Sequence, residues 1–94
     1  MSSQAQLVIH ADGESLKQLI TNNDLLLVDF WADWCAPCKA MAPTINRLAN
    51  EFPSVKVIKV DCEENKELLA EYGVQSLPTI QIYKSGEHVD QLVG

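Results

Sequence analysis

Apolar and polar residues follow two different periods along the chain, and these periods predict the order of its secondary-structure elements. Residues 25–30 are almost continuously apolar, which is typical of a strand covered on both faces. Residues 41–52 carry apolar side chains at helical spacing, and residues 55–61 return to strand-like alternation. The predicted strands lie at residues 6–9, 25–30, 55–61, 78–83 and 87–93, with a helix in each of the first three connections.

Local signals mark several ends of the predicted helices. Residues 12–15 include polar and acidic residues typical of the start of a helix. Asp61, with the carboxylate of Glu64 three residues later, resembles a capping box for the third helix. Gly73 is expected to end the third helix. Pro43 falls inside the second helix and removes one backbone donor, so a kink is predicted there.

The order β-α-β-α-β-α-β-β predicts an α/β fold with a mixed sheet. Helical crossovers imply parallel, right-handed connections among the earlier strands. Turn residues 85–86 join the last two strands into a hairpin, which adds an antiparallel edge. Because 94 residues make one domain and no more, residues 1–94 are expected to form a single domain.

The composition narrows the classes of partner and the compartment. The net charge is −6, which disfavours nucleic acid and anionic membrane surfaces as partners. No apolar stretch approaches the roughly 20 residues that span a bilayer, and residues 1–6 lack the basic and apolar regions of a secretory signal. We therefore expect a cytoplasmic protein, in a compartment where persistent structural disulfides are rare. Three cysteines in that setting favour a reactive dithiol over a disulfide framework.

Cys35 and Cys38 form a Cys-x-x-Cys pair at a predicted strand-to-helix junction, which is typical of a redox motif. Free amide groups and the helix dipole at that end favour the thiolate of Cys35, and Lys39 places a cation nearby. Cys38 lies three residues on, within reach of disulfide geometry. Pro37 stiffens the first turn and is expected to set how easily the dithiol opens. We predict that Cys35 attacks a substrate disulfide and that Cys38 resolves the mixed disulfide.

Two other interpretations of the cysteines were weighed. The pair could be inert, or half of a metal site that Cys62, His10 and His88 complete, but their spacings match no zinc pattern. No metal is therefore expected. Cys62 itself reads as a small buried apolar residue, with a regulatory thiol as the alternative.

Asp29 is a carboxylate inside an otherwise apolar strand, where burial is costly unless the group is paired or protonated. Desolvation is expected to raise its pKa. Such a carboxyl near the cysteines could accept the proton of Cys38 during resolution. The alternative is a solvated carboxylate at a bend in the chain.

Taken together, these residues resemble the thioredoxin family closely, over essentially the whole chain. The motifs that carry the resemblance are Val-Asp-Phe-Trp-Ala-Asp-Trp-Cys-Ala-Pro-Cys-Lys at residues 28–39, Ala42-Pro43, Val60-Asp61, Tyr72-Gly73-Val74 and Leu77-Pro78-Thr79. The resemblance implies a thioredoxin fold, with a central mixed sheet and helices on both faces, and a protein-disulfide reductase active in electron transport and cell redox homeostasis. It implies a monomer whose partners are disulfide-containing proteins and a thioredoxin reductase. Electrons come from NADPH through that reductase, and no cofactor is bound to this chain.

The resemblance also implies a substrate-docking surface beside the cysteines. Pro78 is expected to be a cis-proline packed against them. An extended substrate would lie along the surface by main-chain hydrogen bonds. The expected docking residues are Trp34, Ser76, Leu77, Pro78, Val93 and Gly94.

The chain departs from the family pattern at three places. Ala36 stands where glycine is usual within the cysteine motif, so redox poise or docking is expected to differ. The lysine often found on the strand beside the buried acid aligns with Val57, flanked by Lys56 and Lys59. The chain stops at Gly94, where the family normally continues into a last helix.

Two further functions remain as alternatives to a reductase. One is a disulfide oxidase or isomerase on the same fold, which would need an oxidising compartment. The other is a non-catalytic binding or holdase module that uses the docking surface without turnover.

Overall fold

A five-stranded sheet organises the chain in the computed structural model, which describes residues 8–94. The order of strands across the sheet is β1-β3-β2-β4-β5. The strands are β1 (Val8–His10), β2 (Leu25–Trp31), β3 (Lys56–Asp61), β4 (Thr79–Lys84) and β5 (Glu87–Val93). The helices are α1 (Gly13–Asn22), α2 (Ala36–Glu51) and α3 (Glu67–Glu71). The predicted order of elements is confirmed; residues 6 and 7 of the first predicted strand lie outside the described residues.

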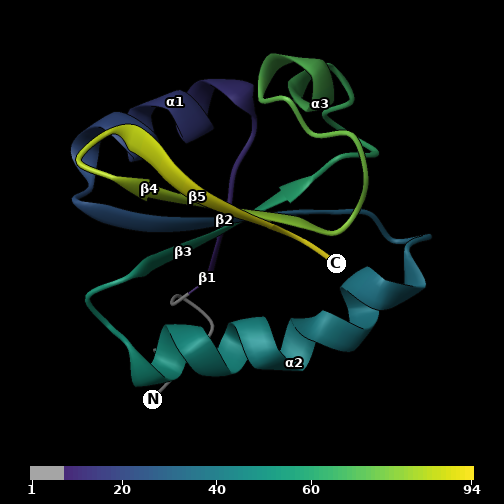
Figure 1. Cartoon of the computed structure of the whole chain (residues 1–94), viewed down its shortest axis with the longest axis horizontal. Coiled ribbons are helices and arrows are strands. Elements are labelled where there is room, and N and C mark those ends of the chain that lie inside the picture. Colours follow the sequence, from purple (N-terminus) through teal and green to yellow (C-terminus); the bar gives the residue numbers. More distant parts are fainter. Residues whose placement is uncertain (1–7) are drawn as a thin grey trace.

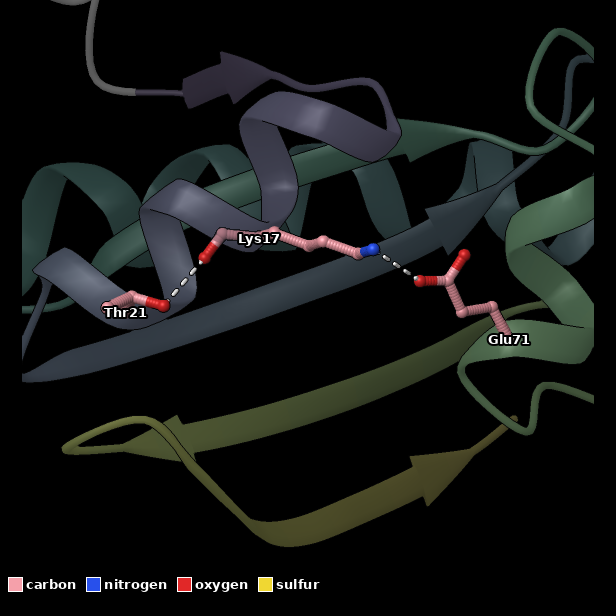
Figure 2. Close-up of polar contacts among 3 residues, drawn as sticks. All are labelled: Lys17, Thr21 and Glu71. Atoms are coloured by element: carbon pink, nitrogen blue, oxygen red, sulfur yellow. Dashed lines mark hydrogen bonds and ion pairs between the residues drawn. The ribbon is translucent and has the colours of Figure 1, made fainter.

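Helices α1 and α3 lie side by side over one face of the sheet, and α2 covers the opposite face (Figure 1). A surface ion pair joins α1 to α3, with Lys17 Nζ 3.3 Å from the Glu71 carboxylate (Figure 2). The hydroxyl of Thr21 donates to the Lys17 carbonyl one turn earlier. Because both charged groups are well exposed, the ion pair contributes little to stability.

The starts of α1 and α2 follow the sequence signals. Asp12 caps α1, since its carboxylate accepts from the Ser15 amide at 3.0 Å and the Ser15 hydroxyl accepts from the Asp12 amide at 3.0 Å. Cys35 is the N-cap of α2, with Pro37 in the first turn. Helix α2 then continues through Pro43, and the kink expected there stays a prediction.

The cap predicted at Asp61 and Glu64 is wrong. Asp61 ends β3, and its carboxylate accepts from the Glu63 amide at 2.9 Å in the turn that follows. Helix α3 begins only at Glu67, and no side chain caps it. Its predicted end is confirmed, because Gly73 follows with a left-handed φ of 69°.

The strand directions correct one part of the predicted topology. β1 and β2 both pair with β3 in parallel, and β4 and β5 form the predicted antiparallel hairpin. β4, however, pairs with β2 antiparallel, although a helical crossover precedes it. The five residues of α3 span only ~8 Å, whereas a six-residue strand spans ~20 Å. The helix is therefore too short to return the chain along the sheet, and β4 starts from the edge where β3 ends.

Alternation along β2 divides the core into two layers. Leu26, Val28 and Phe30 pack under α1 and α3, in the larger apolar cluster. Leu27 packs on the other face against α2, and Asp29 follows it two residues later on that same face. The fold thus places a buried carboxyl on the side of the sheet that α2 covers.

In the described part of the chain, no helix combines the length and apolarity needed to cross a membrane.

Candidate active site at the start of α2

Cys35 and Cys38 are joined by a disulfide at the first turn of α2, with their Cα atoms 5.3 Å apart. Both residues are buried. The backbone turns into the helix after β2, where the Cys35 amide donates to the Ala32 carbonyl at 3.1 Å. The Cys38 amide points back and donates to Cys35 Sγ at 3.2 Å. An amide of the first helical turn is therefore directed at this sulfur, and the same geometry stabilises a thiolate there.

The peptide bond between Leu77 and Pro78 is cis, as the resemblance implies. Leu77 packs against the small apolar cluster that contains the two cysteines. Gly94 lies on the other side of Pro78, where its amide donates to the Pro78 carbonyl at 3.1 Å. A side chain at Gly94 would lie 3.3 Å from Pro78 Cγ, so the backbone approaches the proline ring closely there.

A cavity of about 280 Å³ contains part of the predicted docking surface, and it adjoins the cysteine cluster through Leu77. Trp34, Ser76 and Leu77 line it, together with Cys62 and Lys66. Val93 is absent from its lining and lies on β5, paired with Thr79 and 59% exposed. The docking residues therefore form two patches, one on each side of Pro78.

Trp34 is held by a partner that the sequence interpretation missed. Its side chain is 70% exposed, and its indole N–H donates to Glu63 Oε1 at 2.6 Å. Glu63 reads from the sequence as part of a solvated acidic helix face. The parallel pairing of β2 with β3 could have predicted this contact. Two neighbouring parallel strands end at the same edge of the sheet, so the residues that follow them, here Trp34 and Glu63, lie close together.

The residues expected to tune the redox pair lie on the outside of the first turn. Ala36 and Pro37 are exposed. Lys39 Nζ lies 3.6 Å from the Asp33 carboxylate, and both side chains are largely exposed. The charge of Lys39 is thus shared with an acid on the same loop, which reduces its effect on the cysteine sulfurs.

Asp29 is 2% exposed in the middle of β2, which rules out the solvated bend. Burial raises its pKa to about 6, and the charge of Lys59 opposes that rise. The structure identifies the charge partner of Asp29 as Lys59, one of the two lysines that flank Val57: Asp29 pairs with Lys59, whereas Val57 pairs with Leu27. Lys59 lies two residues after Val57 on β3 and so on the same face of the strand, where it places a charged neighbour beside the carboxyl.

The Lys59 ammonium group also lies 5.1 Å from the centre of the Trp31 ring. Both residues line a second cavity, of about 430 Å³, on this side of the sheet.

The thioredoxin family model matches residues 7–94 of the chain. The chain belongs to the thioredoxin family. Named thioredoxins are thiol-disulfide oxidoreductases, and this chain is a thioredoxin-type enzyme of that class.

Individual thioredoxins agree in sequence and in fold. A thioredoxin of Porphyra purpurea is 49% identical over 82 residues, which cover 85% of this chain and 77% of that protein. The solved thioredoxin of Plasmodium falciparum superposes with a TM-score of 0.88 at 34% identity, covering 92% of this chain and 85% of that one. A structure of a ferredoxin:thioredoxin reductase and thioredoxin f2 complex matches with a TM-score of 0.86 at 27% identity, covering 93% and 82%. The thioredoxin fold implied by the sequence is thus confirmed.

The third cysteine of this thioredoxin-family chain is a free, buried thiol. Cys62 follows β3, and its amide donates to the Trp31 carbonyl at 2.8 Å. Burial, with smaller contributions from the carboxylates of Asp61 and Asp29, raises the pKa of the Cys62 thiol to about 11, and a hydrogen bond with the Trp31 backbone opposes that rise. Among residues 8–94, no three His, Cys, Asp or Glu side chains are grouped to hold a metal ion.

We therefore expect Cys62 to resist alkylation in the folded protein. After reduction, iodoacetamide at pH 8 should label Cys35 first and leave Cys62 at least about 100-fold slower, because only the thiolate reacts and this thiol is neutral. Peptide mass spectrometry measures the labelling of each cysteine. The same protein in urea serves as the control and should label at all three positions. Labelling of folded Cys62 at the rate of Cys35 would instead favour the regulatory thiol.

Proposed function

We propose that the chain reduces disulfide bonds in proteins by dithiol–disulfide exchange, with Cys35 as nucleophile and Cys38 as resolving thiol. The observation that carries this assignment is the hydrogen bond from the Cys38 amide to Cys35 Sγ at the start of α2. It gives the two cysteines unequal surroundings, because only Cys35 receives the free amide of the first turn.

In the first step, the thiolate of reduced Cys35 attacks one sulfur of a substrate disulfide. A new S–S bond forms between Cys35 and the substrate as the substrate's own S–S bond breaks. The released substrate thiolate takes a proton from water. The exposed indole of Trp34 and the segment at Leu77 and Pro78 flank the sulfurs, so an extended substrate has a surface on which to lie.

In the second step, Cys38 loses its proton and attacks Cys35 Sγ. The mixed disulfide breaks, the second substrate sulfur leaves as a thiolate, and two electrons have passed to the substrate. Asp29 is proposed to accept the Cys38 proton, since it lies on the sheet face that α2 covers and is ionised above about pH 6. The Cys35–Cys38 disulfide of this structure is the product of that step.

A reductase must return the electrons before another cycle. A complex of ferredoxin:thioredoxin reductase and thioredoxin f2 is among the matching structures, which supports a reductase as partner. We propose that NADPH supplies the electrons through a thioredoxin reductase, with no cofactor held by this chain. We further propose that the chain acts as a monomer in the cytoplasm, in electron transport and redox homeostasis.

Insulin reduction with NADPH and a thioredoxin reductase tests this function. We expect NADPH oxidation that depends on both the chain and insulin. Circular dichroism should first show that the chain is folded. A folded chain without turnover would contradict the reductase and favour a binding module. The reduction potential of the Cys35–Cys38 pair should be measured against glutathione. A value closer to that of protein disulfide isomerase than to that of thioredoxin would favour the oxidase or isomerase.

A further inference from the structure

The centre of β4 carries a fully buried amide, Gln81, that the steps above do not use. Its side chain lies on the face of the sheet that α1 and α3 cover, because Gln81 pairs with Val28 of that apolar layer. A primary amide in such a layer destabilises the fold unless its donors and acceptor are all bonded.

Every polar position of Gln81 is bonded. Its Nε2 donates to the Tyr72 carbonyl at 2.9 Å and to Gln91 Oε1 at 2.9 Å. Its Oε1 accepts from the Tyr83 hydroxyl at 2.7 Å. The carbonyl of Tyr72 can only accept, so the bond to α3 requires the NH₂ group of Gln81.

The bond to Tyr72 closes a short segment of the chain. Tyr72 follows α3 as its C-cap, and Gly73 then turns the backbone with a left-handed φ. The segment between the two bonded residues, 73–80, carries Ser76, Leu77 and Pro78, which are three of the proposed docking residues. The side chain of Gln81 therefore fixes the beginning of this segment to β4, although Gln81 is far from Cys35 and Cys38 in the sequence.

The other hydrogen bonds of this segment hold its interior and its far end, where the Gly94 amide donates to the Pro78 carbonyl at 3.1 Å. The ring of Tyr72 also packs against Phe30 of β2, with ring centres 5.9 Å apart. The Val74 amide donates to the Leu69 carbonyl at 2.7 Å, and the Thr79 hydroxyl donates to the Ser76 carbonyl at 2.5 Å. Neither of these two hydrogen bonds joins the end of α3 to the sheet. Among the side-chain hydrogen bonds described for residues 8–94, the bond from Gln81 to Tyr72 makes that connection.

We propose that Gln81 is a positioning residue for substrate docking, because its amide fixes the end of α3 and hence the place of the Leu77–Pro78 segment beside the disulfide. The proposal rests on the proposed function, since it concerns how a protein substrate is held for reduction. The ligand is an extended polypeptide next to a disulfide. The chemistry of the sulfurs themselves does not depend on Gln81.

Three variants separate the bond to Tyr72 from the rest of the network. Gln81→Leu removes it together with the bonds to Tyr83 and Gln91. Tyr83→Phe and Gln91→Ala each remove one of the other bonds and leave Gln81 attached to Tyr72. If Gln81→Leu does not fold, Gln81→Met, which is unbranched and lacks the donor, takes its place.

Of the three hydrogen bonds lost in Gln81→Leu, only the one to Tyr72 fixes the docking segment, so we expect KM for insulin to rise about tenfold with kcat within about twofold of the original. Reduction of the Cys35–Cys38 disulfide by dithiothreitol, a small reductant that needs no docking, should keep its rate. Tyr83→Phe and Gln91→Ala should keep KM within about twofold. An equal rise of KM in Tyr83→Phe and Gln81→Leu would overturn the proposal and indicate general loosening of the fold.

Hydrogen exchange supplies a measurement that does not depend on activity. Amides of residues 74–77 should exchange at least about fivefold faster in Gln81→Leu than in Tyr83→Phe, while β2 exchanges equally in both. Unchanged exchange in residues 74–77 would overturn the positioning role. A wild-type chain that does not reduce insulin would overturn the proposed function, whereas the exchange comparison decides the role of Gln81 separately.

Discussion

Replacing Cys35 with serine is expected to lower insulin reduction to the rate of the assay without the protein. The hydroxyl of serine ionises far less readily than a thiol and forms no disulfide, so the first step has no nucleophile. NADPH oxidation in the coupled assay measures the loss. Circular dichroism should remain unchanged, because Cys35 is the N-cap of α2 and serine is a good N-cap residue.

Cys38→Ser should fail at the second step instead of the first. Cys35 then still attacks the substrate, and the mixed disulfide accumulates because no thiol resolves it. Non-reducing mass spectrometry after mixing with insulin should show the adduct for Cys38→Ser and none for Cys35→Ser. Cys62→Ser is the matched control and should keep full turnover. Adducts that form through Cys38 in Cys35→Ser would reverse the two roles.

The order of elements and the cysteine junction were predictable because their signals are local. The apolar run of β2 and the Cys-x-x-Cys at the start of α2 depend on neighbours within one or two turns. The capping of α1 by Asp12 is equally local. Each of these features depends on residues close together in the sequence, so one sequence was enough to predict it.

The features that were missed depend on residues far apart in the sequence. The place of Lys59 beside Asp29 requires the register between β2 and β3, which joins residues 30 positions apart. The contact of Trp34 with Glu63 spans 29 residues. The antiparallel direction of β4 depends on the length of α3, which a wrongly placed cap at Asp61 overestimated. The roles proposed for the cysteines, Asp29 and the docking residues remain predictions.

The position of Lys59 opposite Asp29 changes how the buried carboxyl is understood. A lysine paired with Asp29 in the neighbouring strand partly offsets the burial of the carboxyl, yet the pKa still reaches about 6. The fold therefore tolerates a group that is unfavourable when ionised. Because a base for Cys38 must be ionised near neutral pH, the same property that destabilises the fold makes Asp29 suitable for the second step.

Asp29→Asn is accordingly expected to make the protein more stable and less active. The pKa of Asp29 is about 6 in the folded chain and near 3.8 when exposed to water, so the folded state binds the proton more tightly. The free energy of unfolding of the protein with Asp29 therefore falls as the pH rises from about 4 to 6. Above pH 7 it is lower by the full effect of the pKa difference, about 3 kcal/mol. Asparagine carries no charge to desolvate. Urea unfolding of the oxidised proteins should show Asp29→Asn more stable by up to about 3 kcal/mol at pH 8 and no more stable at pH 4.

The same variant should slow resolution of the mixed disulfide at pH 8 by about 100-fold, and the step in rate near pH 6 should disappear. Stopped-flow measurement of the second step against pH provides the test. Glu51→Gln is the matched control, because Glu51 is an exposed carboxylate at the far end of α2 and should change neither stability nor rate. A gain in stability without a change in the rate of resolution would show that Asp29 is buried without acting as the base. A slower rate without the gain in stability would show that the charge of Lys59 offsets the unfavourable burial of the Asp29 carboxylate.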